Sequence, residues 1–326
     1  MNEKVYPVCV IGGGSAGTMA VLRTVLNNDE CLFFPGNSKD KKRSRGMWVK
    51  KVENIPSHFH YNRGIEEPNK DTFRWIEQSP FKKNFHVIYN VGVTSLKKIG
   101  DLFLISASNG QKYLAEYIIL CTGVMDVQPE IEGKIEKVFD YANAQTINYC
   151  LICDGHHVIN KKTTVIGHTN SAAWISIMLY ERYKPLNMHI LTNGNKSEFQ
   201  NDTIKLLEAY GIKICESKIL QIQGQNKGAI LEAFIMDDGT KIETDICFIS
   251  LGMIVYNQLA KELGADLDER GFVKADESGL TSISGLYVAG DIKANTKKQI
   301  YTAWDHAVNA ANAINMKLRI SRRPIL

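Results

Sequence analysis

A glycine-rich turn begins twelve residues into the chain, directly after a short apolar run. The run, Val5–Ile11, reads VYPVCVI, and a helical pattern then continues to about Leu26. Strand, turn and helix form the first half of a βαβ unit. In the pattern Gly12-x-Gly14-x-x-Gly17 the first glycine makes the tight turn, the second lets the backbone approach a pyrophosphate, and the third allows close helix packing. Since a helix N-terminus also attracts phosphate, the sequence predicts a bound adenine dinucleotide.

The second strand, Cys31–Phe34, lacks one feature expected of such a unit. It ends in FFPGNS, with no acid to bind the ribose hydroxyls, so another group must do so. The basic run KDKKRSR follows at residues 39–45 and is predicted to be a solvated loop. Docking of an acidic partner on this run is the alternative.

A second glycine turn follows an apolar strand that begins at Lys162. It keeps a glycine at its first place and a small residue at its sixth, but it puts Thr169 where the backbone must come closest to phosphate. The next strand is followed by LTNGNKSEF, which offers only Lys196 for a 2′-phosphate. The turn therefore predicts a doubtful NAD(P)H site or a nucleotide fold that has lost its nucleotide; the candidate residues are Gly167, Thr169, Ser171 and Ala172.

A repeated sequence pattern indicates that the chain contains two similar halves. KYLAEYIILCTG and KIETDICFISLG each read as an acidic turn, an apolar strand and a glycine, and the chain then returns through GLYVAGD to a final helix at Lys298–Met316. The order predicts an α/β fold with two Rossmann-like nucleotide-binding domains of three-layer ββα type, the second inserted in the first. The predicted boundaries are 1–120 and 250–326 for the first domain and 121–249 for the second.

Two of the seven cysteines are paired in the stretch NYCLICDG, as Cys150 and Cys153. The other five are scattered, mostly in apolar runs, and are expected to be small buried hydrophobes. A zinc site needs four ligands, and the adjacent His156 and His157 would point apart on an extended chain, so no metal is predicted. A Cys-x-x-Cys pair in a βαβ context instead favours a redox dithiol. Asp154 can exchange its proton, and capping a helix is a compatible role.

Gly290 and Asp291 follow the strand in GLYVAGD, just before the final helix. A carboxylate at this place can accept hydrogen bonds from the polyol chain of a cofactor, and the helix would direct the positive end of its dipole at the same molecule. Capping of the helix by Asp291 is the alternative.

Composition excludes several classes of protein. The net charge of +4 is too small to argue for nucleic acid or membrane binding. No apolar run approaches the ~20 residues that span a bilayer, and the N-terminus shows no signal-peptide pattern. A cytoplasmic location is therefore expected.

These motifs together resemble the low-molecular-weight thioredoxin reductases of the FAD-dependent pyridine nucleotide-disulfide oxidoreductase superfamily. The resemblance rests on GGGSAG, VENIP, CTG, CLICDG, a second glycine turn and YVAGD followed by KQI, and it covers essentially the whole chain. It implies an FAD domain made of both chain ends, an inserted domain that carries the dithiol, and a homodimer. It also implies that Cys153 faces the flavin, that Cys150 attacks the partner disulfide, and that FAD contacts Gly12, Gly14, Ser15, Ala16, Gly17, Asn54, Gly123, Gly290, Asp291, Gln299 and Ile300.

The sequence departs from this family at the NADPH motifs. A His-Arg-Arg cluster normally follows the strand after the second turn, whereas this chain has Leu191-Thr192-Asn193-Gly194. The resemblance therefore implies reduction of thioredoxin or a similar protein with a donor that need not be NADPH; reduced ferredoxin is one alternative. A dithiol oxidase that uses oxygen and a non-catalytic flavin redox sensor are the others. Trp304 and His306, early in the final helix, would lie near the flavin ring, where an aromatic side chain could stack on the flavin or block access to it; core packing of Trp304 is the alternative.

Overall fold

The computed structural model describes residues 4–37 and 44–324, so most of the basic run at 39–45 lies outside the described residues. The chain divides into two compact units, each described below by itself. Unit 1 comprises Met1–Ser44, Ile65–Met125 and Val255–Leu326, and unit 2 comprises Arg45–Gly64 and Asp126–Ile254. The division expected from the sequence differs, because it placed residues 45–64 in the first domain.

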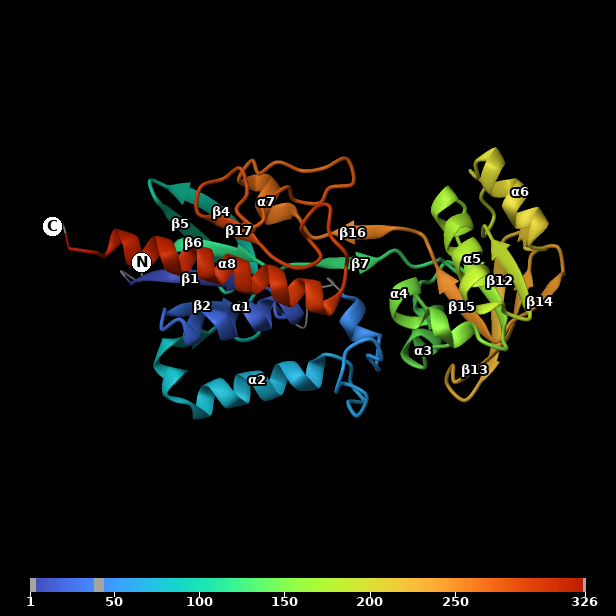
Figure 1. Ribbon diagram of the computed structural model, residues 1–326, viewed down its shortest axis with the longest axis horizontal. Helices are drawn as coiled ribbons and strands as arrows, with labels where there is room; N and C mark the ends of the chain where they lie inside the picture. Colours follow the sequence, from blue (N-terminus) through green and yellow to red (C-terminus); the bar gives the residue numbers. More distant parts are fainter. Residues whose placement is uncertain (1–3, 38–43, 325–326) are drawn as a thin grey trace. The chain divides into compact units, whose positions relative to one another are not determined.

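Unit 1 is built on a seven-stranded sheet in the order β3-β2-β1-β6-β5-β4, with β17 also paired to β6 (Figure 1). Strands β1, β2, β3, β6 and β17 run parallel, whereas β4 and β5 are antiparallel to their neighbours. The strands are β1 (Val5–Ile11), β2 (Cys31–Phe34), β3 (Phe85–Val87), β4 (Val93–Ile99), β5 (Leu102–Ala107), β6 (Lys112–Leu120) and β17 (Leu286–Val288). The helices are α1 (Ser15–Leu26), α2 (Glu66–Gln78), α7 (Gln258–Glu262) and α8 (Ile300–Ser321).

Strand β1 is almost continuously apolar because both of its faces are buried. Cys9 and Ile11 pack into one core cluster, whereas Val8 and Val10 pack into a second cluster on the opposite face. The second cluster contains the buried faces of α1 and α8, which lie side by side. A parallel strand at the centre of a sheet has this pattern, and it places the glycine turn after β1 at the carboxyl edge of the sheet.

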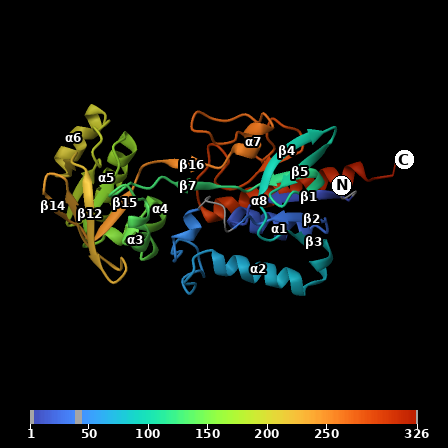
Figure 2. The same cartoon turned by 180° about the vertical axis from the view of Figure 1, so that it is seen from behind.

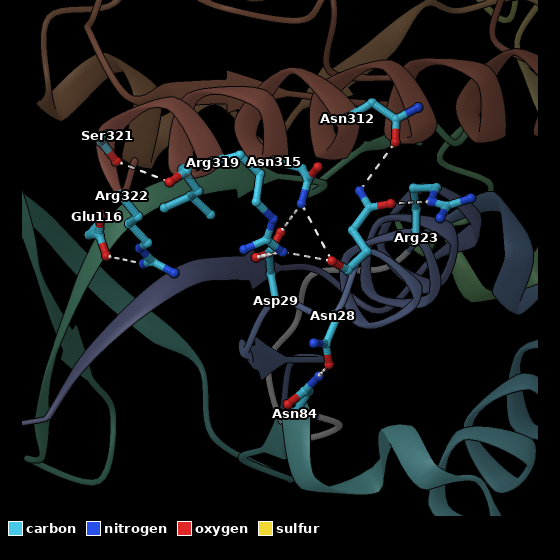
Figure 3. A network of polar contacts seen from close by, with 12 residues as sticks. Arg23, Asn28, Asp29, Asn84, Glu116, Asn312, Asn315, Arg319, Ser321 and Arg322 are labelled. Carbon is cyan, nitrogen blue, oxygen red and sulfur yellow. Dashed lines mark hydrogen bonds and ion pairs between the residues drawn. The ribbon is translucent and has the colours of Figure 1, made fainter. Parts of the chain in front are cut away.

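A polar network ties α8 to the end of α1 (Figure 3). Arg319 and Asn315 each donate a hydrogen bond to the carboxylate of Asp29, at 2.7 Å. The Asp29 side chain is only 2% exposed, so its charge is paired away from water. The last helix is therefore fixed against the first βα unit, although the two are nearly 300 residues apart in sequence.

Unit 2 contains a five-stranded parallel sheet in the order β11-β10-β9-β15-β8 and a three-stranded antiparallel sheet, β12-β13-β14. Helices α5 and α6 lie side by side, and α5 packs against β9 and β10 of the parallel sheet (Figures 1 and 2). The strands are β8 (Ile147–Asn148), β9 (Lys162–Ile166), β10 (Asn187–Leu191), β11 (Lys213–Cys215), β12 (Ile219–Gln225), β13 (Ile230–Met236), β14 (Lys241–Glu243) and β15 (Ile246–Ile249). The helices are α3 (Phe139–Asn143), α4 (Leu151–Asp154), α5 (Asn170–Tyr183) and α6 (Asn201–Ala209).

The short strands β7 (Val124–Asp126) and β16 (Met253–Val255) form a two-stranded sheet where the chain passes between the units. Together the two units confirm the predicted α/β class with parallel sheets. A hairpin at Asn109-Gly110 joins β5 to β6, and Gly110 takes a positive φ of +81°. Within the described residues, no helix is both long and apolar enough to cross a membrane.

Candidate functional site

The first glycine turn of unit 1 shows why glycine stands at each of its three positions. A Cβ at Gly12, where φ is +115°, would lie 2.3 Å from the carbonyl oxygen of Cys121. A Cβ at Gly17 would lie 1.7 Å from the carbonyl oxygen of Gly12, so helix and turn could not pack. At Gly14, in contrast, a Cβ would have no neighbour within 4 Å. Two of the glycines therefore serve packing, and the third leaves open space at the start of α1.

That open space lies at the N-terminus of α1, where the backbone offers hydrogen-bond donors. Gly14 is the N-cap residue, it makes no side-chain cap, and no acidic residue occupies the first turn of α1. Ser15 is half-buried, whereas Ala16 is buried. The N-terminus of this 12-residue helix, with free space in front of its amides, suits a phosphate group. The residues therefore fit the pyrophosphate of a dinucleotide.

The structure brings the late Gly290-Asp291 motif to the same turn. A Cβ at Gly290, where φ is +80°, would lie 2.7 Å from the Cβ of Ala16. The predicted capping role of Asp291 is wrong, because α8 begins at Ile300 and Gln299 is its N-cap residue. The charge of Asp291 acts on Lys298, whose pKa falls to about 8 because burial outweighs the favourable charge of Asp291. Both chain ends thus supply polar groups to one edge of unit 1.

Two further predicted positions lie in unit 1. Gly123 follows β6 with a φ of +68°, and its carbonyl oxygen accepts a hydrogen bond from the Tyr256 amide at 3.1 Å. His306 is buried in α8, and its Nδ1 atom makes no hydrogen bond with any residue that the structure describes. Trp304 is half-buried. An unpaired buried nitrogen near the start of α8 offers a polar contact to a bound molecule. Asn54, in contrast, belongs to unit 2.

The paired cysteines occupy the start of the short helix α4 in unit 2. Cys150 is the N-cap residue, and its Sγ accepts a hydrogen bond from the Cys153 amide at 3.1 Å. The two sulfurs form a disulfide, with their Cα atoms 5.3 Å apart. Cys150 is 8% exposed and Cys153 is half-buried. The pair therefore has the geometry of a closed Cys-x-x-Cys dithiol at a helix N-terminus, where thiolates are stabilised.

The remaining cysteines are free, and four of them are buried, as predicted: Cys9, Cys31, Cys121 and Cys247. Burial raises the pKa of each of these four thiols, to about 12 for Cys247. Cys215 differs, because it is only half-buried. Thiols with raised pKa values are poor nucleophiles, so the redox chemistry of unit 2 centres on the disulfide pair.

Asp154 directly follows the pair and is 4% exposed. Burial raises the pKa of its carboxyl to about 6; His157, Arg45 and His156 oppose this shift, and Glu53 adds to it. Asp154 is the N-cap residue of the following 3₁₀ helix, but its side chain makes no cap hydrogen bond. The capping role is therefore not supported. A carboxyl that titrates near neutral pH can give and take a proton beside a dithiol.

Replacing Asp154 with asparagine is expected to remove a pH dependence of stability. The folded-state pKa of about 6 exceeds the unfolded value of about 3.9. The wild type therefore loses stability, on the order of 3 kcal/mol, as the pH rises from about 4 to about 6. The amide cannot ionise, so the variant should gain stability relative to the wild type over this window and hold a constant advantage above it. Urea unfolding across these pH values measures the difference.

Asp202→Asn is the matched control for this prediction, because its side chain is 97% exposed. It removes the same charge without a buried carboxyl, and it should leave the pH profile of unfolding unchanged. Parallel profiles for wild type and Asp154→Asn would show that Asp154 has an ordinary pKa.

Sequence reasoning missed the residues that surround the dithiol helix. Arg45, expected at the end of a solvated basic run, binds the carboxylate of Asp126 through two hydrogen bonds, of 2.8 and 2.5 Å. The imidazoles of His156 and His157 lie in the 3₁₀ helix Gly155–Val158, and both contact Glu53. These partners are about 80 to 100 residues apart in sequence, so no local signal could have indicated them.

The second glycine turn joins β9 to α5, and the segment of the same chain around Glu198 contacts it. Thr169 forms an isolated parallel bridge with Glu198, whose amide donates a 2.7 Å hydrogen bond to the His168 carbonyl oxygen. The side chain of Asn170 is bound by Gln200, and its Oδ1 accepts a further hydrogen bond from Thr203 at 2.6 Å. The buried Nδ1 of His168 makes no hydrogen bond with the described residues. The turn therefore has the packing of a nucleotide loop, with the Glu198–Thr203 segment bound to its backbone and to the Asn170 side chain.

The packing role of Gly167 in this turn matches that of Gly12. A Cβ at Gly167 would lie 2.5 Å from the Ser250 carbonyl oxygen and 2.7 Å from the Cβ of Ala172. Ser171 also contacts Ser250, through their hydroxyl groups at 3.4 Å. The two small residues of the motif therefore serve close helix packing in unit 2.

The segment after β10 offers Lys196 among neutral and acidic groups, where a 2′-phosphate needs several cations. Thr192 is buried and bonds the carbonyl oxygen of Asn195. The Asn193 amide is held by Ile219 and Glu130. Ser197 donates two hydrogen bonds to the Glu216 carboxylate, at 2.6 and 2.8 Å, and these hold the pKa of Glu216 below its usual value. A carboxylate at this edge of the sheet repels a phosphate dianion.

Comparison with known proteins gives the same picture over the whole chain. The family model described as pyridine nucleotide-disulphide oxidoreductase matches residues 6–311. Thioredoxin reductase of Mycoplasma genitalium is 25% identical over 315 residues, which cover 95% of this chain and 94% of the relative. Thioredoxin reductase of Bacillus subtilis is 24% identical over 325 residues, covering 96% and 95%. The solved thioredoxin reductase of Streptococcus pyogenes shares the fold, with a TM-score of 0.80, 21% identity and coverage of 97% and 99%.

The matched region includes both glycine turns, the Cys-x-x-Cys pair and the Gly290-Asp291 motif. The resemblance drawn from the sequence is therefore confirmed. The chain belongs to the pyridine nucleotide-disulphide oxidoreductase family, and it is an oxidoreductase of flavoprotein type.

Proposed function

We propose that the protein is an FAD-dependent thioredoxin reductase that receives its electrons from a carrier other than NADPH, such as reduced ferredoxin. The substrate is the disulfide of thioredoxin or of a similar protein. The observation that carries the proposal is the contrast between the two glycine turns. The first turn keeps open space at Gly14, whereas Thr169 in the second turn forms a backbone bridge with Glu198.

The residues of unit 1 that would hold FAD come from both chain ends. The amides at the start of α1, with Gly12, Gly14, Ser15, Ala16 and Gly17, would bind the pyrophosphate. Asp291 would bind the ribityl hydroxyls, with Gly123, Gly290, Gln299 and Ile300 beside the cofactor. FAD, when bound, supplies a two-electron centre that can reduce a disulfide. Its binding by Asn54 stays a prediction.

The chain's own residues then carry the thiol chemistry. Two electrons cleave the Cys150–Cys153 bond, and two protons complete the dithiol. The thiolate of Cys150 attacks one sulfur of the partner disulfide and releases the other as a thiolate. Cys153 attacks the mixed disulfide, releases the second partner thiolate and restores the Cys150–Cys153 bond. Asp154 holds the proton that these steps exchange. The assignment of the attacking sulfur rests on the family resemblance.

The donor assignment rests on charge. Binding the 2′-phosphate of NADPH needs charge-assisted hydrogen bonds, each of which contributes about 1.5–3 kcal/mol. The described residues after β10 provide Lys196 beside the carboxylates of Glu198 and Glu216. NADPH is therefore expected to bind this chain poorly. A homodimeric state and a cytoplasmic location also remain predictions from the resemblance and the sequence.

An anaerobic comparison of donors tests the proposal. The purified yellow protein is mixed in turn with NADPH, NADH, reduced ferredoxin and dithiothreitol, and the visible flavin absorbance is followed. Ferredoxin should bleach the flavin at least about a hundredfold faster than NADPH at equal concentration, since two missing charged contacts cost about 3 kcal/mol or more. Equally rapid bleaching by micromolar NADPH would contradict the donor assignment.

Two other outcomes of this comparison would favour the alternative functions. Bleaching by dithiothreitol, followed by oxygen consumption with turnover, indicates a dithiol oxidase. Absence of bleaching by every donor indicates a redox sensor without turnover.

A further inference from the structure

Glu53, His156 and His157 form a cluster beside the dithiol helix of unit 2. The Nε2 atom of His156 lies 3.0 Å from Oε2 of Glu53, and Nε2 of His157 lies 2.6 Å from the same oxygen. All three ligand atoms lie within 4.8 Å of one another. The prediction that the two adjacent histidines point apart is wrong, because they lie in a 3₁₀ helix and not on an extended chain.

The chemistry of these three groups suits a borderline divalent cation. Two imidazole nitrogens and one carboxylate oxygen, with a fourth position open to water, make up a donor set that zinc uses in proteins. Ligand atoms about 2.0–2.1 Å from a tetrahedral zinc ion lie roughly 3.4 Å apart. The observed separations from Oε2, 2.6 and 3.0 Å, need to widen by less than about 1 Å. We propose that Glu53, His156 and His157 bind Zn²⁺.

The segment that carries Glu53 is held in place without an ion. Arg45, at its start, makes two hydrogen bonds to Asp126, whose side chain is only 6% exposed. Trp48 stacks on Phe139, with the ring centroids 4.9 Å apart. The binding groups therefore come from two chain segments that other contacts already hold together. Such preorganisation lowers the entropic cost of binding the ion.

Solvent can reach the cluster. The side chains of Glu53, His156 and His157 are 33%, 48% and 19% exposed. An ion can therefore enter, and water can complete its coordination. Oxygen-preferring Mg²⁺ matches this set poorly, since it favours carboxylates and water over imidazole.

The cluster adjoins Cys150 and Cys153, which could themselves bind zinc as thiolates. The test therefore uses the fully oxidised protein, in which both sulfurs are bonded to each other. A Cys215→Ser background removes the half-buried free thiol. Calorimetry with ZnCl₂, checked by competition with a chromogenic chelator, should show one ion per chain, and excess Mg²⁺ should not compete.

Variants assign the site. We expect at least about tenfold weaker Zn²⁺ binding in each of the variants Glu53→Gln, His156→Gln and His157→Gln. Loss of a residue that only hydrogen-bonds to a metal ligand already weakens binding by about that factor. The double variant His156→Gln/His157→Gln should abolish it. His58→Gln is the matched control: His58 lies in the same segment as Glu53, and its Nδ1 lies 3.1 Å from the Pro56 carbonyl oxygen. This variant should bind Zn²⁺ as the parent protein does.

Co²⁺ provides a second readout, because a tetrahedral nitrogen and oxygen site gives it visible absorption bands. These bands should appear in the parent protein and disappear in the double variant, while circular dichroism confirms that both are folded. Absence of Zn²⁺ binding by the parent, or equal binding by the double variant and the parent, would overturn the proposal. The measurement needs neither an electron donor nor turnover, so its result is independent of the proposed function.

Discussion

Serine at Cys150 or at Cys153 is expected to lower thioredoxin reduction at least about a thousandfold, the scale seen when a nucleophile is removed. The physical reason is that a serine hydroxyl neither forms a disulfide nor ionises at neutral pH. The remaining cysteine cannot accept an electron pair by breaking a bond to its neighbour. Steady-state reduction of thioredoxin, with the donor identified by the anaerobic comparison, measures the loss for both variants.

FAD content separates this effect from misfolding. Both serine variants should be purified yellow, because all the groups that would bind FAD except Asn54 lie in unit 1, and the dithiol lies in unit 2. Cys215→Ser is the matched control, since it replaces a partly accessible thiol that is not in the disulfide. It should retain full activity. Wild-type turnover by Cys150→Ser or Cys153→Ser would contradict the dithiol mechanism.

Alanine at Gly14 is expected to weaken FAD binding without unfolding the protein. A Cβ at this position meets no protein atom within 4 Å, and φ is −78°, which alanine adopts without strain. If the pyrophosphate fills this space, the added methyl group clashes with it at a cost of about 1–3 kcal/mol. FAD affinity should therefore fall roughly 10- to 100-fold. Flavin fluorescence during titration of the apoprotein measures this change.

Alanine at Gly17 is the informative comparison for this prediction. Its Cβ would lie 1.7 Å from the carbonyl oxygen of Gly12, so the variant should lose stability as well as flavin. Thermal unfolding of the two apoproteins separates the effects: Gly14→Ala should melt as the wild type does, and Gly17→Ala should melt at a lower temperature. Unchanged FAD affinity in Gly14→Ala would show that the cofactor does not occupy the first turn.

Local sequence was informative wherever backbone geometry dictated the residue. Gly12 is required by its close approach to Cys121, directly after β6, and Gly17 by its close approach to Gly12. These two glycines therefore identify the βαβ unit from sequence alone. The buried β1 strand has a continuous apolar run for the same reason. Helix α2, in contrast, was not predicted: its sequence is mostly polar, and only Ile76 and, in part, Phe73 pack against the core of unit 1. Pro68, in its first turn, is compatible with a helix start.

The surroundings of the dithiol could not be predicted, because they depend on contacts between distant segments. Arg45 was interpreted with its basic neighbours, yet it pairs with Asp126, 81 residues later. Glu53 lies more than 100 residues before the two histidines that it binds. The pKa of Asp154 likewise depends on burial by the folded chain. The local pattern CLICDG indicated the redox pair, and only the fold revealed the charged groups around it.

An anaerobic reductive titration tests the central claim most directly, namely that flavin and Cys150–Cys153 are two centres of one electron path. Each is a two-electron couple, so the wild type should take up about four electron equivalents per FAD, and either serine variant about two. Oxidised thioredoxin should then reoxidise the wild type and leave the flavin of the variants reduced. Uptake of only about two equivalents by the wild type, or thioredoxin-dependent reoxidation of either variant, would contradict the account.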